Sequence, residues 1–264
     1  MKNIVVIGVP RTEGLIRSFT ENYLYKLFNL SDVLLIPLPE SLCKDLVSRS
    51  LSEESYDPMI SLRYLNASLE RIWRPVLQMI MRFGRESFLW SRGLYCYLKD
   101  DFIKTLEERA VSLGYLLFKA NVYGKIDVDE WIFLFRGSEE KFDWRAYIDD
   151  LRESFEKMII VSDSYRDLYE MKTSLSDYDL CVLSEFYPNP LEALDVLINI
   201  FRTSDKNIIR NMILWAVDYL NRIKTSYSFD DLYEYYKRSF EYKSFIKRLG
   251  LEIFEVSCEN LVGS

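Results

Sequence analysis

Short apolar runs alternate with amphipathic stretches along the first 185 residues of the chain. Residues 3–9 (NIVVIGV) and 33–38 (VLLIPL) are continuous apolar runs next to Gly or Pro, which is typical of buried strands. Between them, residues 15–30 place apolar side chains at the i, i+3, i+4 and i+7 spacing of an amphipathic helix. A strand, a helix and a strand in this order form a βαβ unit, so the pattern predicts a sheet that begins parallel.

The same patterns predict the elements that follow. Helices are expected at residues 57–82, 100–118, 127–135, 144–155 and 166–174, and strands at 87–90, 157–161 and 180–183. Pro188 and Pro190 mark a boundary, beyond which helices are expected at 191–202, 206–223 and 229–249, with a last strand at 252–256. We therefore predict an α/β domain over residues 1–187, with a parallel or mixed sheet and flanking helices, and a helical C-terminal domain over 188–264.

Composition excludes several classes of chemistry. The 264 residues include no histidine, so an imidazole base, a Ser-His-Asp triad and a histidine-ligated metal are excluded. Neither GxGxxG nor GxxxxGK[ST] occurs, so the common phosphate-binding loops are absent from the sequence. The net charge of -7 argues against a nucleic-acid partner. We predict no metal, no cofactor and no catalytic residue.

The cysteines and the apolar stretches bear on localisation. The four cysteines form no CxxC pair, and Cys96 and Cys181 stand in apolar runs that predict buried, unreactive thiols. The N-terminal apolar run is too short for a signal peptide, and no stretch of 18 apolar residues occurs. These features predict a soluble cytoplasmic protein without membrane contact. A single glutamine among many charged residues indicates a thermophilic source.

Polar residues follow the predicted strands, where open parallel sheets bind ligands. Arg11 and Arg92 are expected to clamp an anion, since guanidinium groups match phosphate and carboxylate, and Glu13 and Asp163 are a candidate carboxylate pair. The alternative interpretation is that these residues cap helices and solvate loops. The predicted anion cleft comprises Gly8, Arg11, Glu13, Glu40, Arg92, Ser162, Asp163 and Tyr165.

Tyrosines crowd the C-terminal region. They are a candidate surface for a homodimer or another protein partner, because tyrosine is favoured at interfaces; packing within the domain is the alternative. The residues are Tyr219, Tyr227, Tyr233, Tyr235, Tyr236 and Tyr242. The five tryptophans, which alternate with apolar neighbours, are expected in the core.

The order of elements over about residues 3–185 resembles the TraB/ChaN group, which is related to the erythromycin-esterase-like fold. The matching pieces are Gly8-Val-Pro-Arg11, DVLLIPLPE, Ser91-Arg92-Gly93, TLEERA, WRAYIDDLRESFEKMIIV and Ser162-Asp-Ser-Tyr165. The group's two GxxH histidines are replaced here by Arg11 and Tyr165, while Gly8, Arg92 and Arg152 remain. The resemblance implies a member that has lost the chemistry of those histidines.

These observations favour a non-catalytic ligand-binding or protein-interaction protein on a degenerate hydrolase-like α/β scaffold, whose ligand is a small anion. One alternative is a phosphate-ester or nucleotide hydrolase that works without histidine, through carboxylates and arginines. Another is a nucleotide sensor joined to a helical effector module, of the kind linked to CRISPR systems. Fold alone does not separate the three.

Overall fold

The computed structural model describes residues 3–52, 54–90, 92–136, 143–226 and 228–258. The chain divides into two compact units. The sheet unit contains residues 1–103, 143–186 and 254–264, and the helical unit contains residues 104–142 and 187–253. The chain thus passes between the units four times, once at the predicted boundary near residue 187. A single boundary near residue 187 would put residues 104–142 in the sheet unit and residues 254–264 in the helical unit. Each of these two segments belongs to the other unit instead.

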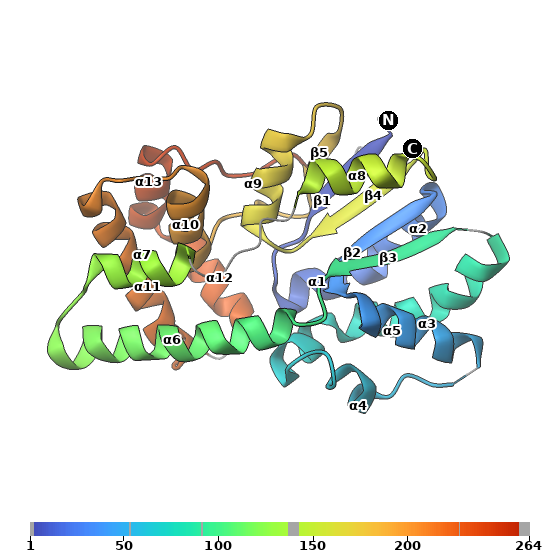
Figure 1. The fold of residues 1–264 in the computed structure, drawn as a ribbon, viewed down its shortest axis with the longest axis horizontal. Coiled ribbons are helices and arrows are strands. Elements are labelled where there is room, and N and C mark those ends of the chain that lie inside the picture. Colours follow the sequence, from blue (N-terminus) through green and yellow to red (C-terminus); the bar gives the residue numbers. More distant parts are fainter. Residues whose placement is uncertain (1–2, 53, 91, 137–142, 227, 259–264) are drawn as a thin grey trace. The chain divides into compact units, whose positions relative to one another are not determined.

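The sheet unit is built on five parallel strands in the order β3-β2-β4-β1-β5, which confirms the predicted α/β fold (Figure 1). The strands at residues 4–8 and 158–162 are buried along their whole length, because helices cover apolar runs such as IVVIG on both faces of the sheet. Parallel pairing sets Gly8 beside Ser162, so that β1 and β4 end at the same level. The strands are β1 (Ile4–Gly8), β2 (Val33–Pro39), β3 (Gly93–Leu98), β4 (Met158–Ser162) and β5 (Asp179–Val182).

Helices cover both faces of this sheet (Figure 1). One layer contains α1 (Glu13–Phe19), the π-helical turn η1 (Thr20–Leu24), α2 (Tyr25–Leu30), α3 (Glu40–Leu51), α4 (Pro58–Ser61) and α5 (Ala67–Trp90). The other contains α8 (Trp144–Arg152) and α9 (Tyr165–Ser174). The apolar stripes of these helices meet the strands and form a three-layer core.

The helical unit contains α6 (Phe102–Tyr123), whose first two residues belong to the sheet unit, and α7 (Val128–Arg136). Its C-terminal part contains α10 (Pro190–Asp195), the π-helical turn η2 (Val196–Ile200), α11 (Lys206–Ile223), α12 (Phe229–Arg238) and α13 (Phe240–Arg248). Pro190 begins α10 at a position where its missing N–H costs nothing, and Asn189 and Glu192 form a reciprocal capping box there. No helix in the described ranges is long and apolar enough to cross a bilayer.

Five secondary-structure predictions were wrong or incomplete. The predicted helix 57–82 is two helices, α4 and α5, which residues 62–66 separate. Residues 87–90 are not a strand; helix α5 continues to Trp90, and the third strand begins at Gly93 instead. The helix over residues 40–51 was not predicted. The predicted helix 229–249 is two helices, because Ser239 leaves the helical conformation and caps α13 with its hydroxyl. Residues 252–256 form one isolated bridge, Phe254 with Phe186, and not a strand.

Candidate functional site

Connections from the sheet diverge between β2 and β4, because β2 leads toward β3 on one side and β4 toward β5 on the other. In parallel α/β sheets this position, outside the carboxyl ends of the strands, is where ligands bind. The segments that leave the neighbouring strands here bring Arg11, Glu40 and Asp163 to one edge of the sheet. We call this the carboxyl edge.

Arg11 and Asp163 form a two-pronged ion pair at the carboxyl edge. The Nε of Arg11 donates to Oδ2 of Asp163 at 2.5 Å, and Nη2 donates to Oδ1 at 2.9 Å. The Asp163 side chain is only 2% exposed, whereas that of Arg11 is 34% exposed. The pair joins the turn after β1 to the turn after β4, and it satisfies a buried carboxylate within the protein itself.

Asp167 and Tyr97 flank this pair. Burial, with the negative charges of Glu170 and Asp163, raises the pKa of Asp167 to about 7, although Arg166 and Arg11 act in the opposite direction. The hydroxyl of Tyr97 donates to the carbonyl oxygen of Val161 at 2.9 Å, and burial raises the pKa of Tyr97. A carboxyl group that titrates near neutral pH is the one acid–base group that we identify at this edge.

Other charged groups along the carboxyl edge are also paired within the sheet unit. Asp100, which follows β3, accepts hydrogen bonds from the backbone N–H of Ser41 at 2.9 Å and from its hydroxyl at 2.5 Å, and these bonds lower the pKa of Asp100. Asp100 therefore supplies a negative charge at the N-terminus of α3, where the helix dipole favours it. Glu40 accepts from Lys44 at 2.5 Å, and Glu13 accepts from Arg17 at 3.1 Å.

The predicted anion clamp does not form, because Arg92 lies at the other edge of the sheet. Arg92 precedes β3, so it stands at the amino end of the strands, whereas Arg11 follows β1 at the carboxyl end. The guanidinium of Arg92 donates to the carbonyl oxygen of Phe28 and to Oδ1 of Asn29, both at 3.0 Å. It binds the C-terminal end of α2. The error follows from the misassigned strand at residues 87–90.

Three more residues of the predicted cleft have packing roles. A Cβ on Gly8 would stand 2.7 Å from Cδ1 of Leu168 and 2.9 Å from Cγ1 of Val182, so the glycine allows α9 and β5 to approach β1. Ser162 is fully buried and its Oγ accepts from the backbone N–H of Ser164. Tyr165, also fully buried, packs its ring 5.4 Å from that of Phe254. The apolar partners of Gly8 leave no room for a ligand at that point.

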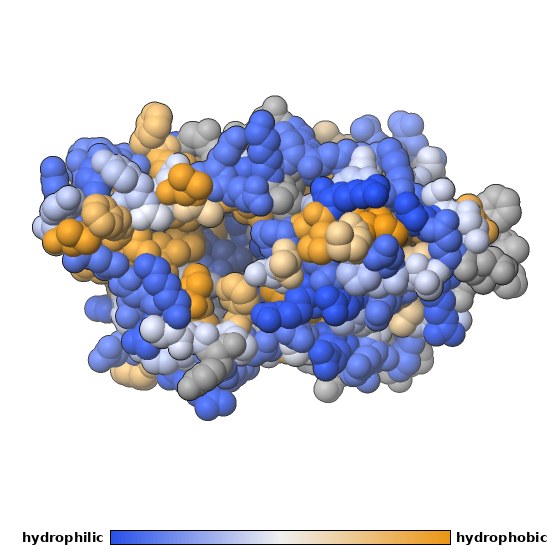
Figure 2. Space-filling view, turned by 90° about the horizontal axis from the view of Figure 1, so that it is seen from below, coloured by the Kyte–Doolittle hydropathy of each residue, from blue (hydrophilic) through white to orange (hydrophobic). Residues whose placement is uncertain are grey.

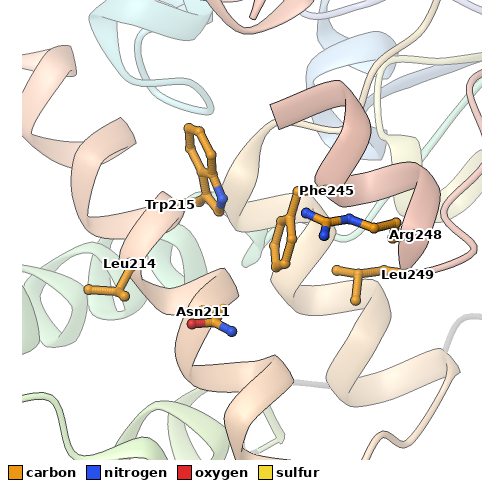
Figure 3. A pocket seen from close by; sticks show the side chains of 6 residues that line it. All are labelled: Asn211, Leu214, Trp215, Phe245, Arg248 and Leu249. Carbon is orange, nitrogen blue, oxygen red and sulfur yellow. The ribbon is translucent and has the colours of Figure 1, made fainter. Parts of the chain in front are cut away.

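A pocket lies in the helical unit, on helices that sequence reasoning treated as packing elements only. It measures ≈ 560 Å³ and opens between α11 and α13 (Figure 3). Its walls are Asn211, Leu214, Trp215, Phe245, Arg248 and Leu249. The pocket is widely open to solvent, and its walls combine apolar surface with a few polar groups.

Two polar groups of this pocket, the guanidinium of Arg248 and the indole N–H of Trp215, only donate, whereas the amide of Asn211 both donates and accepts. The guanidinium of Arg248 donates through Nε to the carbonyl oxygen of Ser244 at 3.3 Å, and no carboxylate of the described residues pairs with it. The indole N–H of Trp215 and the amide of Asn211 likewise have no hydrogen-bond partner in the part of the chain that the structure describes. In Figure 3 the ring of Phe245 stands between the indole and the guanidinium. The pocket therefore presents positive charge and hydrogen-bond donors beside aromatic surface.

The tyrosines behind Trp215 hold it in place. Tyr236 and Tyr242 are buried, and the ring of Tyr242 lies 5.3 Å from the indole of Trp215. Tyr233 accepts from the backbone N–H of Tyr187, while Tyr227 lies outside the described residues. Most of the described tyrosines in this cluster therefore pack within the helical unit. The spacing of Phe245, Arg248 and Leu249 on one helical face was the sequence signal for the pocket, but it does not say which helix lies opposite.

The cysteines are paired, which corrects the prediction of free buried thiols. Cys43 and Cys96 form one disulfide and Cys181 and Cys258 the other, with Cα–Cα distances of 6.0 and 5.0 Å. They join α3 to β3, and β5 to the segment that returns at residues 254–258. Disulfides are rare in the cytosol of mesophiles but frequent in oxidising compartments and inside hyperthermophiles. A cytoplasmic location and a thermophilic source remain predictions.

No group of three or more metal-ligating side chains occurs among the residues that the structure describes. Comparison with protein-family models, with curated proteins and with solved structures gives no match to this chain. The candidate sites therefore rest on the geometry of the carboxyl edge and of the pocket.

Proposed function

We propose that this chain is a non-catalytic ligand-binding protein, and that its ligand, a small anion with a flat apolar body, binds in the pocket between α11 and α13. The observation that carries the proposal is the guanidinium of Arg248, which faces the pocket without a carboxylate partner among the described residues. The scaffold would be the degenerate relative of the TraB/ChaN group that the order of elements implies.

The chemistry of the walls selects the ligand class. Trp215 and Phe245, whose ring centroids are 6.5 Å apart, offer π-faces to an aromatic or other planar group. Arg248 and the indole N–H of Trp215 favour a carboxylate or phosphate on that group, since charge-assisted hydrogen bonds are roughly twice as strong as neutral ones. A neutral molecule of the same shape would leave these donors unsatisfied.

The carboxyl edge supports the same conclusion, because its charged groups are already paired within the protein. The ion pair of Arg11 with Asp163, the hydrogen bonds of Ser41 to Asp100 and the contact of Lys44 with Glu40 neutralise the main groups that a substrate would use there. An anion that bound Arg11 would have to compete with a buried carboxylate already in place.

The test is a fluorescence titration with 3-phenylpropionate, phenyl phosphate and the neutral 3-phenylpropanamide, followed through tryptophan emission. Both anions are expected to bind and the amide to bind at least tenfold more weakly, about the worth of one charge-assisted hydrogen bond. Arg248→Gln should weaken the binding of both anions by about the same factor. Lys247→Gln, the same charge change on the exposed neighbouring residue, is the matched control and should bind as the wild type does.

Equal affinity of the anion and the amide, or of Arg248→Gln and Lys247→Gln, would contradict the proposal. Adenosine monophosphate belongs in the same titration, because the nucleotide-sensor alternative requires it to bind more tightly than phenyl phosphate. A thermal-shift screen of nucleotides, phosphosugars and divalent ions provides an independent readout, since a specific ligand raises apparent stability by mass action.

One observation favours a second candidate, a hydrolase that works without histidine: the pKa of Asp167 at about 7 would suit a general acid beside Arg11. We expect no phosphatase, esterase or peptidase activity, with or without zinc. A turnover above about 1 s⁻¹, within the usual enzyme range, that is lost in Asp167→Asn, Asp163→Ala or Glu13→Ala would establish the hydrolase instead.

A further inference from the structure

Residues 254–258 follow the helical unit in the chain but belong to the sheet unit, where they run beside β5. Phe254 forms an antiparallel bridge with Phe186, and Ser257 forms a parallel bridge with Val182. These are isolated bridges and not a continuous ladder, so the segment is bound to the sheet without being a strand of it. We call residues 254–258 the strap.

The strap is anchored at its two ends. At one end the side chain of Phe254 is buried, and its carbonyl oxygen accepts from the backbone N–H of Phe186 at 2.8 Å. At the other end Cys258 is buried and forms the disulfide with Cys181. The three residues between these anchors are exposed, Val256 to 66%.

The strap covers the outer edge of the sheet, where β5 is the last strand. The backbone N–H of Val182 points outward and donates to the carbonyl oxygen of Val256 at 2.7 Å. The next N–H, of Leu183, points inward and donates to the carbonyl oxygen of Gly8 at 3.0 Å. Proteins commonly cover such an edge, because its free backbone groups pair with other chains. Here the strap supplies the cover.

The disulfide decides whether the far end of the strap stays in place. Ordering residues 255–258 costs conformational entropy, and each backbone bond that they make returns little net free energy because water competes for the same groups. The exposed side chains of residues 255–257 add little burial. A covalent bond holds the end at β5 whatever the strength of these contacts. Without it, Phe254 is the anchor and the end is expected to detach.

We propose that the disulfide of Cys181 with Cys258 is a redox-controlled latch, and that reduction by a dithiol releases residues 255–258 from β5. A thiolate of the dithiol attacks one sulfur of the pair, and the other cysteine leaves as a thiolate that takes up a proton. The second thiol of the reductant then closes the disulfide of the reductant and frees the remaining cysteine. Two electrons and two protons thus pass to the pair, and a disulfide oxidant reverses the reaction.

The other disulfide is not placed to act in this way. Cys43 lies within α3 and Cys96 within β3, so regular secondary structure holds both partners when their bond is cut. Exposed apolar surface does not distinguish the strap either, because Figure 2 shows such surface on the side where α6 runs in Figure 1. The distinguishing feature is a disulfide at the end of an irregular segment, next to three exposed residues.

Amide hydrogen exchange, followed by NMR in oxidised protein and in protein treated with dithiothreitol, tests the latch. After reduction the amide of Val182 should exchange about tenfold faster or more, because its acceptor leaves with the strap. The amide of Leu183 is the internal control and should keep its rate, since its acceptor is in β1. Oxidised glutathione should restore the slow exchange of Val182.

Two variants assign the effect to this pair. Cys258→Ser should show fast exchange at Val182 without any reductant. Cys43→Ser combined with Cys96→Ser should keep slow exchange at Val182 until dithiothreitol is added, as the wild type does.

Three results would overturn the latch. In the first, the pair stays oxidised in folded protein under excess dithiothreitol. In the second, Val182 exchanges at an unchanged rate in protein whose cysteines are shown to be reduced, or in Cys258→Ser. In the third, Val182 and Leu183 accelerate equally, which would mean that the disulfide stabilises the whole sheet unit and does not hold the strap in particular.

Discussion

Replacing Arg11 with alanine is expected to destabilise the sheet unit, because it leaves the carboxylate of Asp163 buried without its partner. The Asp163 side chain is 2% exposed and both of its oxygens accept from the guanidinium. Removing one member of a fully buried pair costs about 3–5 kcal/mol. Arg11 is 34% exposed, so water reaches part of the pair, and we expect a smaller loss of about 2–3 kcal/mol in the free energy of unfolding.

Urea denaturation measures this loss. With a slope of about 3 kcal/mol/M, at the upper end of the range for small proteins, the midpoint should fall by about 0.7–1 M at an unchanged slope. The measurement belongs under non-reducing conditions, so that both disulfides stay intact. Arg17→Ala is the control, because Arg17 is 58% exposed and pairs with the partly exposed Glu13. Its midpoint should shift by the equivalent of about 0.5 kcal/mol at most.

A double-mutant cycle separates the charge from the shape of the side chain. Asp163→Asn removes the buried charge but keeps the size of the group, so Arg11→Ala combined with Asp163→Asn should be more stable than Arg11→Ala alone. If Arg11→Ala unfolds at the same urea concentration as Arg17→Ala, or if Asp163→Asn rescues nothing, the pair does not hold the two turns together. Arg11 would then be free to bind an anion, and phosphate should stabilise the wild type but not Arg11→Ala.

Two further predictions concern Asp167 and the disulfides. The pKa of Asp167 is about 7 in the folded chain and about 3.9 when unfolded, so the folded state holds the proton more tightly and stability should fall as pH rises from about 4 to 7. In urea denaturation at pH 8, Asp167→Asn should be more stable than the wild type by about 1–3 kcal/mol, and near pH 4 the two should be equally stable. Equal stability at pH 8 would refute this pKa of Asp167. Protein that is purified without reductant and then unfolded should show no thiol reactive toward Ellman's reagent. Reduction should lower the free energy of unfolding by up to about 4 kcal/mol per disulfide, because the disulfides close loops of 53 and 77 residues. Four reactive thiols in the freshly unfolded protein would show instead that the pairs do not form.

The central strands follow from hydrophobic patterning alone. The runs NIVVIGV, VLLIPL and KMIIV predict strands wherever they fold, because a continuous apolar segment of this length must be buried on both faces. The polar turns after them predicted that Arg11 and Asp163 would lie at one edge. These inferences need only the local chain and the rule that parallel strands end together.

Patterning failed where neighbours in space decide the element. Residues 87–90 (SFLW) are apolar enough for a strand, but helix α5 continues through them to Trp90, and the strand forms instead at Gly93–Leu98, where only Cys96 and Tyr97 are buried. That shift of a few residues moves Arg92 from one edge of the sheet to the other. A short apolar run fits a strand and a buried helix equally well, so its length and surroundings decide.

Which side chains meet depends on how the elements pack in three dimensions. The sequence contains Arg11 and Asp163 as separate residues 152 positions apart, and nothing local indicates that one neutralises the other. The same holds for Cys181 and Cys258, and for Trp215 and Phe245, which line one pocket from two helices. Periodicity along the chain reports which face of an element is buried. It carries no information about which other element covers that face, because that choice depends on the packing of the whole unit.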